Sequence, residues 1–235
     1  PRSTLFPYTT LFRSYDRFLL YQKLQELDQD PGFGELKSLD SLPKVERLPH
    51  QVEAVQTALR RMRGWCLLAD EVGLGKTIEA GILIKELMMR NLVRKILIIT
   101  PKDLCTQWQQ ELFEKFELFF LVFGKDVDYS LAWQCDRVIA SYKVIDDYFH
   151  RKELLSQRYD LVIIDEAHHL IEADEKTEWL VREFTLTLRK NYFLMLSATP
   201  LHNDLKELHT LLTFLKPGSV GNFEDFKKQI GRAHV

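Results

Sequence analysis

The sequence has few of the features that mark membrane, fibrous or disulfide-rich proteins. No window holds 18 consecutive apolar residues, which excludes a transmembrane helix. There are only three cysteines, Cys66, Cys105 and Cys135, and their odd number and wide spacing fit neither a disulfide framework nor a metal site. We therefore expect reduced, mostly buried thiols in a cytoplasmic protein without a membrane partner.

A surplus of positive charge is also absent. Lys and Arg total 32 against 34 Asp and Glu, which gives a formal net charge of −2. A nucleic-acid partner would need a local basic patch, because no overall field attracts it. Hydrophobic residues make up 46% and charged residues 28% of the 235 positions. These ordinary values predict a globular domain with a real core and exclude disordered, collagen-like and coiled-coil classes.

The two ends differ in composition from the rest of the chain. Residues 4–14 (TLFPYTTLFRS) lack helix and strand periodicity and resemble the translation of a sequencing adaptor, and residues 230–235 (IGRAHV) resemble the opposite adaptor. We expect residues 1–14 and 230–235 to be artefacts that bound an internal piece of a longer protein. The alternative is a pair of poorly structured natural tails.

Short apolar runs alternate with longer amphipathic stretches from residue 50 onward. The runs predicted to be strands are 65–69, 95–100, 118–123, 137–140, 161–164 and 192–196. The stretches predicted to be helices are 50–62, 76–90, 104–116, 144–155, 176–188, 204–215 and 223–229. This alternation predicts an α/β fold with a mostly parallel sheet and helices on both faces. Ligands of such sheets bind beyond the carboxyl ends of the strands, where the polar clusters of this sequence fall.

The strongest chemical signal follows the first predicted strand. Residues 69–77 read ADEVGLGKT, a glycine-rich turn that opens a helix, where backbone N–H groups can converge on phosphate oxygens. Lys76 would reach the β- and γ-phosphates of ATP, and the Thr77 hydroxyl would bind Mg²⁺. The strict phosphate-loop pattern has glycine where this chain has Asp70, and a bare GKT also fits an ordinary helix start. The loop residues predicted to bind nucleotide are Asp70, Glu71, Val72, Gly73, Leu74, Gly75, Lys76 and Thr77.

A second motif, LVIIDEAH at residues 161–168, places two carboxylates at the tip of a buried strand. Asp165 could hold Mg²⁺ directly or through water, and Glu166 could polarise the attacking water. A lone Asp-Glu pair more often closes a strand as a solvated turn. The two motifs in this order, each after its own strand, predict ATP hydrolysis with Lys76, Asp165 and Glu166 as catalytic residues.

A third motif, LSATP at residues 196–200, again follows an apolar run. With it, the chain resembles the first motor lobe of superfamily 2 helicases. The segments DEVGLGKTIEAG, DEAHH and LSATPLHNDLKELHTLLTFLKPG are most similar to the Swi/Snf-like branch of double-stranded DNA translocases. Within that branch, the chain resembles the bacterial group that includes the RNA-polymerase-associated ATPase. The resemblance spans about residues 45–229, and the family's Asp at the start of the loop accounts for Asp70.

The resemblance implies a RecA-like phosphate-loop domain at residues 48–229, preceded by a pre-motor segment at 15–47. It implies ATP and Mg²⁺ as cofactors and double-stranded DNA as a partner in the prokaryotic cytoplasm or nucleoid. The resemblance is also compatible with RNA polymerase or another protein complex as a partner. A second RecA-like lobe, absent from these residues, would complete the site with arginines, so we expect the chain alone to be nearly inactive.

The resemblance also assigns roles outside the two main motifs. Gln51 would read the adenine edge, because an amide offers a donor beside an acceptor; a polar first helical turn is the alternative reading. The residues that would couple the nucleotide site to DNA are Ser197, Ala198 and Thr199. Those that would contact the DNA backbone are Thr100, Pro101, Ser141 and Tyr142, through strand-end hydroxyls and N–H groups. For Trp108, we favour a place in the helix core over a base-stacking platform.

Two other functions stay open at this point. DEAH and SATP motifs are compatible with a helicase that separates DNA or RNA strands, which single strands would stimulate more than duplex. A non-catalytic, nucleotide-gated subunit of a restriction, repair or transcription complex is the second alternative. The intact Lys76, Asp165 and Glu166 argue against it.

Overall fold

The computed structural model describes residues 32–69, 75–126, 131–170, 186–197, 205–216, 218 and 220–233. The chain divides into two compact units, residues 1–35 and 36–235. The described part of the first unit contains a single 3-10 turn, η1 (Gly32–Gly34). Among the described residues, no helix has the length and apolar character that crossing a bilayer requires.

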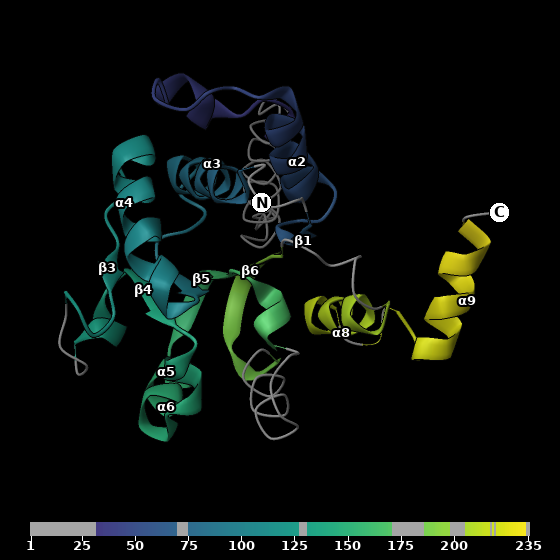
Figure 1. Cartoon of the computed structure of the whole chain (residues 1–235). Coiled ribbons are helices and arrows are strands. Elements are labelled where there is room, and N and C mark those ends of the chain that lie inside the picture. The colour runs from purple at the N-terminus through teal and green to yellow at the C-terminus, as the bar shows by residue number, and fades with distance from the viewer. Residues whose placement is uncertain are drawn as a thin grey trace, which may run out of the picture. The chain divides into compact units, whose positions relative to one another are not determined.

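The described strands of the second unit form one parallel sheet in the order β1-β6-β5-β2-β4-β3 (Figure 1). They are β1 (Trp65–Leu68), β2 (Ile96–Thr100), β3 (Leu121–Val122), β4 (Arg137–Ser141), β5 (Arg158–Ile164) and β6 (Arg189–Leu196). Since every pairing is parallel, the carboxyl ends of all six strands meet at one edge of the sheet. The predicted α/β fold with a parallel sheet is confirmed.

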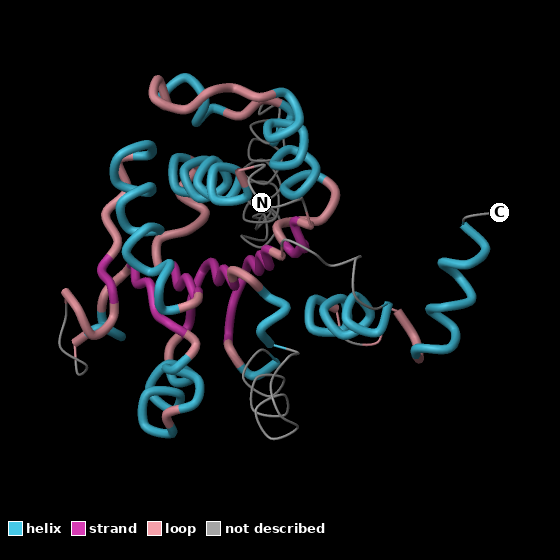
Figure 2. The backbone as a smooth tube through the Cα atoms, in the orientation of Figure 1, coloured by secondary structure: helices cyan, strands magenta, loops and turns pink. Residues whose placement is uncertain are grey.

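Helices cover both faces of this sheet (Figure 2). The described α-helices are α2 (Pro49–Arg60), α3 (Lys76–Met89), α4 (Cys105–Phe116), α5 (Lys143–Asp146), α6 (Tyr148–Ser156), α8 (Leu205–Leu215) and α9 (Phe223–Ala233). The remaining 3-10 turns are η2 (Lys37–Ser41), η3 (Lys102–Leu104), η4 (Ala132–Gln134) and η5 (Ala167–Leu170). Figure 1 shows α2, α3 and α4 on one side of the sheet and α5 and α6 on the other.

The structure departs most from the predicted elements at two places. The run 118–123 yields only the short strand β3, because Glu117 is left-handed (φ +56°) and the Leu118 N–H returns to the Leu112 carbonyl at 3.0 Å. The predicted helix 144–155 is broken at Asp147, which is extended and accepts the His150 N–H at 2.9 Å as the cap of α6. The predicted helix 176–188 lies mostly outside the described residues.

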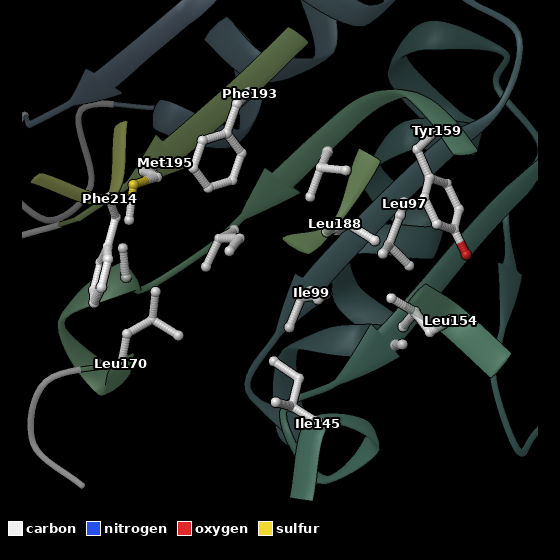
Figure 3. Packing of buried hydrophobic residues seen from close by; sticks show 14 of the residues in the cluster. Leu97, Ile99, Ile145, Leu154, Tyr159, Leu170, Leu188, Phe193, Met195 and Phe214 are labelled. Carbon is white, nitrogen blue, oxygen red and sulfur yellow. The ribbon is translucent and has the colours of Figure 1, made fainter. Parts of the chain in front are cut away.

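Alternate residues of the central strands build the core on the α5–α6 side (Figure 3). Val162 and Ile164 of β5 lie on this face, as do the residues beside them on β2 and β6. They pack with Val144 of α5, Leu154 of α6 and Phe214 of α8. The neighbouring strand residues are equally buried on the opposite face. Burial on both faces explains why these strands read as continuous apolar runs.

Helix α3 is buried almost all round and lies on the face opposite to that cluster (Figure 1). Ile82, Ile84 and Leu87 have no exposed surface. Gly81 lets α4 approach, because a Cβ there would overlap the fully buried ring of Phe116. Packing thus fixes α3, whose first residue, Lys76, follows Gly75.

A buried carboxylate joins α3 to the segment that precedes the sheet. Glu86 accepts the Ser38 N–H at 2.7 Å through one oxygen and the Arg90 guanidinium at 2.6 Å through the other. Burial by itself raises the pKa of Glu86, but the hydrogen bonds from Ser38 and Arg90 outweigh it and lower the pKa below its usual value. Residues 36–47, predicted as the end of the pre-motor segment, therefore belong to the same compact unit as the sheet.

We predict that Glu86→Gln lowers the free energy of unfolding at pH 7 by about 1–3 kcal/mol, because charge-assisted hydrogen bonds are lost. Since folding lowers the pKa of Glu86, its stabilisation is complete above the pKa of the unfolded state and is lost as pH falls through the folded pKa. Denaturant titrations between pH 7 and pH 3 measure both effects.

The matched control is Glu111→Gln, which removes a more exposed i,i+4 pair with Lys115. It should change the free energy of unfolding by less than about 1 kcal/mol. If the wild type and Glu86→Gln lost stability equally as the pH fell, the ionised carboxylate would not stabilise the fold.

Candidate functional site

A cleft of about 730 Å³ opens at the carboxyl edge of the sheet, within the size range of small-molecule sites. Four segments that are distant in sequence line it: residues 44–51, 75–78, 104–115 and 165–166. The predicted nucleotide-site residues that share this lining are Gln51, Gly75, Lys76, Thr77, Asp165 and Glu166. Asp70, Glu71, Val72, Gly73 and Leu74 lie outside the described residues.

Gly75 is the residue that caps the N-terminus of α3. Gly75 has φ +90°, and its carbonyl accepts the N–H groups of Ile78 (2.8 Å) and Glu79 (3.0 Å). A Cβ at Gly75 would also meet the amide nitrogen at the end of the Gln51 side chain, which would have to shift, so the positive φ is the main reason for glycine here. The first turn of a helix leaves N–H groups without intrahelical partners, and these favour an anion. Lys76 and Thr77 stand on this turn and line the cleft.

Asp165, at the end of β5, is only 7% exposed and is held by three donors. Its Oδ2 accepts the Thr100 hydroxyl at 2.9 Å and the indole N–H of Trp108 at 2.7 Å. Its Oδ1 accepts the Glu166 N–H at 2.9 Å. The interpretation of Trp108 as a buried helix residue is confirmed, while its bond to Asp165 had no signal in the sequence.

Glu166 adopts a left-handed backbone (φ +49°), which costs energy for a residue with a side chain and is typical of functional sites. The Tyr142 hydroxyl donates to the carbonyls of Asp165 and Glu166 and helps to hold this turn. Burial, together with the charges of Asp165 and Glu166, raises the pKa of Tyr142 well above its usual value, so the phenol stays a donor. Nδ1 of His168 lies 3.3 Å from Oε2 of Glu166.

The structure places the side-chain hydroxyls of two residues predicted to contact DNA inside the protein, and a contact of these residues with DNA stays a prediction. The Thr100 side chain is fully buried and engaged with Asp165, and the Tyr142 hydroxyl is bonded inside the protein. Both are drawn inward because the end of β5 supplies buried acceptors that need donors. Pro101 and Ser141 are partly exposed, and their role on a DNA face stays a prediction.

Of the predicted coupling residues, the structure describes Ser197, which is fully buried at the end of β6. Its N–H donates to the Leu68 carbonyl at 3.0 Å, which ties β6 to the end of β1. Ala198 and Thr199 lie outside the described residues.

The cleft also contains residues that carried no motif. Lys44 and Glu46 come from the segment before α2, and Glu111 and Lys115 form an ion pair of 3.2 Å on α4. Of these four residues, only Glu111 and Lys115 had a signal in the sequence, namely their i,i+4 spacing. Packing against α3, which the sequence pattern does not encode, brings both segments to the cleft.

A second cleft of about 420 Å³ lies beyond the ends of β2 and β4. Lys102, Lys125, Lys143 and His150 line it together with Ser141. Within the described part of the chain, no Asp or Glu lines this cleft. It is therefore a local basic surface on a chain whose overall charge is slightly negative.

The donor set of the first cleft fits Mg²⁺ bound with a phosphate ligand. The Thr77 hydroxyl and the carboxylates of Asp165 and Glu166 are hard oxygen donors, and Mg²⁺ in proteins commonly takes one or two carboxylates with substrate phosphates. No group of three or more His, Cys, Asp or Glu residues that could hold a metal alone occurs within the described ranges. The helix start at Lys76 matches the same phosphate-bearing ligand.

Comparison with known proteins agrees with this geometry. The model of the SNF2-related domain matches residues 50–234. An uncharacterised ATP-dependent helicase of Bacillus subtilis, YqhH, is 40% identical over 220 residues, which are 93% of this chain and 38% of the relative. The RNA polymerase-associated protein RapA of Pectobacterium carotovorum is 30% identical over 221 residues, which are 90% of this chain and 23% of the relative.

Two solved structures share the fold. The Sulfolobus solfataricus SWI2/SNF2 ATPase core in complex with dsDNA has a TM-score of 0.64 and 26% identity, covering 79% of this chain and 39% of that one. The ATPase core domain from the same organism has a TM-score of 0.66 and 24% identity, covering 86% of this chain and 40% of that one, and shows likeness of fold alone. This chain thus spans between about a quarter and two-fifths of these relatives. The resemblance inferred from the motifs is confirmed: the chain belongs to the SNF2-related domain family of helicase-like ATPases.

Proposed function

We propose that this chain is the ATP-binding lobe of a motor that hydrolyses ATP with Mg²⁺ and moves along double-stranded DNA once a second lobe completes the site. The observation that carries the proposal is the shared cleft, which gathers Lys76 and Thr77 from the start of α3 and Asp165 and Glu166 from the end of β5. A cation, two carboxylates and a helix start around one cavity form the arrangement that phosphoryl transfer needs.

Five side chains of the cleft then have a defined task. The Lys76 ammonium neutralises charge that develops on the β- and γ-phosphate oxygens, while Thr77 and Asp165 hold the metal. When bound, Mg²⁺ supplies further positive charge to the same oxygens. Glu166 orients and polarises the attacking water. Gln51, packed against Gly75, presents its amide to the base.

The Lys76→Ala substitution in the full-length protein should lower the rate of ATP hydrolysis by about 100-fold or more, because the transition-state charge loses its cation. The fold should be retained, since Lys76 stands at the start of α3 and lines the cleft. A steady-state ATPase assay beside a thermal unfolding curve measures both. Hydrolysis at a near wild-type rate would remove the phosphate-loop assignment.

The Glu166→Gln substitution separates binding from chemistry. Its amide keeps the size of the side chain but cannot accept a proton, so hydrolysis should fall by about 10²–10⁴-fold while ATP still binds. Equilibrium binding of ATP and single-turnover hydrolysis are the two measurements. Unchanged turnover would exclude Glu166 as the residue that activates water.

Duplex DNA is proposed as the track on two grounds. The basic cleft of Lys102, Lys125 and Lys143 borders the predicted backbone segments at Pro101 and Ser141, and it is a local patch of the kind that phosphate contacts require. The ATPase core of S. solfataricus, which has the same fold, is in complex with dsDNA.

Replacing Lys102, Lys125 or Lys143 by Ala in the full-length protein should weaken duplex binding equally across sequences and reduce the slope of log K against log salt by about 1. Fluorescence anisotropy at several salt concentrations measures the slope. Lys227→Ala on α9, an exposed lysine outside this cleft, is the matched control and should leave the slope unchanged. Equal effects of all four substitutions would refute a DNA face at the basic cleft.

We propose two partners besides DNA: a second lobe and a protein complex such as RNA polymerase. The second lobe would supply the transition-state arginines, with Ser197, Ala198 and Thr199 linking the nucleotide to the DNA face. RapA is named for its association with RNA polymerase, which makes such a complex one candidate target.

The B. subtilis relative is named a helicase, which favours strand separation as the second candidate function. Stronger ATPase stimulation by single strands than by duplex would select it.

A further inference from the structure

We propose that Trp108 and Thr100 position the carboxylate of Asp165 for binding Mg²⁺. Their hydrogen bonds occupy Oδ2 and leave Oδ1 to face the metal. The inference rests on the proposed function, which makes Asp165 a metal ligand. It adds residues from β2 and α4 that no motif connects with metal binding.

The three hydrogen bonds of Asp165 are unevenly shared between its two oxygens. Oδ2 receives both side-chain donors, the Trp108 indole at 2.7 Å and the Thr100 hydroxyl at 2.9 Å. Oδ1 receives the Glu166 N–H at 2.9 Å, and a carboxylate oxygen has room for one further partner. The carboxylate cannot rotate without breaking bonds on both oxygens. Its orientation is therefore fixed before any cation arrives.

The indole is well suited to hold a carboxylate. Its N–H can donate but cannot accept, and Trp108 is 2% exposed, so packing sets the direction of the donor. The bond is shielded from water and is made to a charged acceptor, which makes it stronger than a neutral one. Mutation of a residue that holds a metal ligand by a hydrogen bond typically lowers metal affinity by 10- to 100-fold.

A second buried tryptophan provides the matched control. Trp133 is 3% exposed and stacks on Phe123 with ring centroids 4.6 Å apart. Among the described residues, its indole N–H has no hydrogen-bond partner. Trp108→Phe and Trp133→Phe therefore remove the same atoms from similarly buried sites. The first substitution also removes a bond to Asp165 and the second does not.

The experiment uses the full-length protein and two measurements that need no turnover. One is the Mg²⁺ concentration that gives half of the metal-dependent rise in Tm at saturating ADP. The other is ADP affinity in EDTA. Trp108→Phe should raise the required Mg²⁺ concentration by about 10-fold or more and leave metal-free ADP affinity within about 2-fold. Trp133→Phe should lower Tm without changing the metal requirement.

The Thr100 variants keep the test decisive if Trp108→Phe fails to fold. Thr100→Val has nearly the same shape but no hydroxyl, so it should raise the Mg²⁺ requirement, and Thr100→Ser should restore it. Wild-type requirements in Trp108→Phe and Thr100→Val, beside a raised one in Asp165→Asn, would overturn the positioning role alone. A rise of equal size in Trp133→Phe would also overturn it. An unchanged requirement in Asp165→Asn would overturn the proposed metal ligand itself.

Discussion

The buried carboxylate of Asp165 is the point on which the site depends. A charge at 7% exposure is tolerated only where donors surround it, and here they come from β2, from α4 and from the next residue of the chain. The parallel order of the sheet makes this possible, because β2 and β5 are neighbours and end at the same edge. The start of α3 faces the same cleft. The order of the strands thus places Asp165 and Glu166 beside the start of α3, where Lys76 lies.

Much of this architecture could be predicted from the sequence because its signals are local. Continuous apolar runs predicted the buried strands, and α3 begins at Lys76 as expected because Gly75 and the apolar stretch after it define a helix start. The order of the strands and the tertiary hydrogen bonds could not be predicted. Thr100 looked like an exposed strand end, yet it is buried because β5 ends beside it with an acceptor. The break at Asp147 depends on a single capping bond that competes with a continuous helix.

The two clefts have no described lining residue in common, but hydrogen bonds between strand ends connect the proposed chemistry with the proposed track. Thr100 ends β2, Tyr142 follows the last residue of β4, and both donate to the Asp165–Glu166 turn. Pro101 and Ser141 are their immediate neighbours in sequence. A phosphate bound at the basic surface would therefore lie next to residues whose side-chain hydroxyls donate to the Asp165 carboxylate and to the carbonyls of Asp165 and Glu166. In this protein, the hydroxyls expected on the outer face lie in the connection between the two sites.

The most direct test of the central claim is a crystal structure of the full-length protein with Mg²⁺ and a non-hydrolysable ATP analogue. We predict the triphosphate in the 730 Å³ cleft, with Nζ of Lys76 about 3 Å from a β- or γ-phosphate oxygen and Oδ1 of Asp165 in the coordination shell of the metal or of its water. A nucleotide bound elsewhere, with Lys76 and Asp165 contacting neither phosphate nor metal, would contradict it.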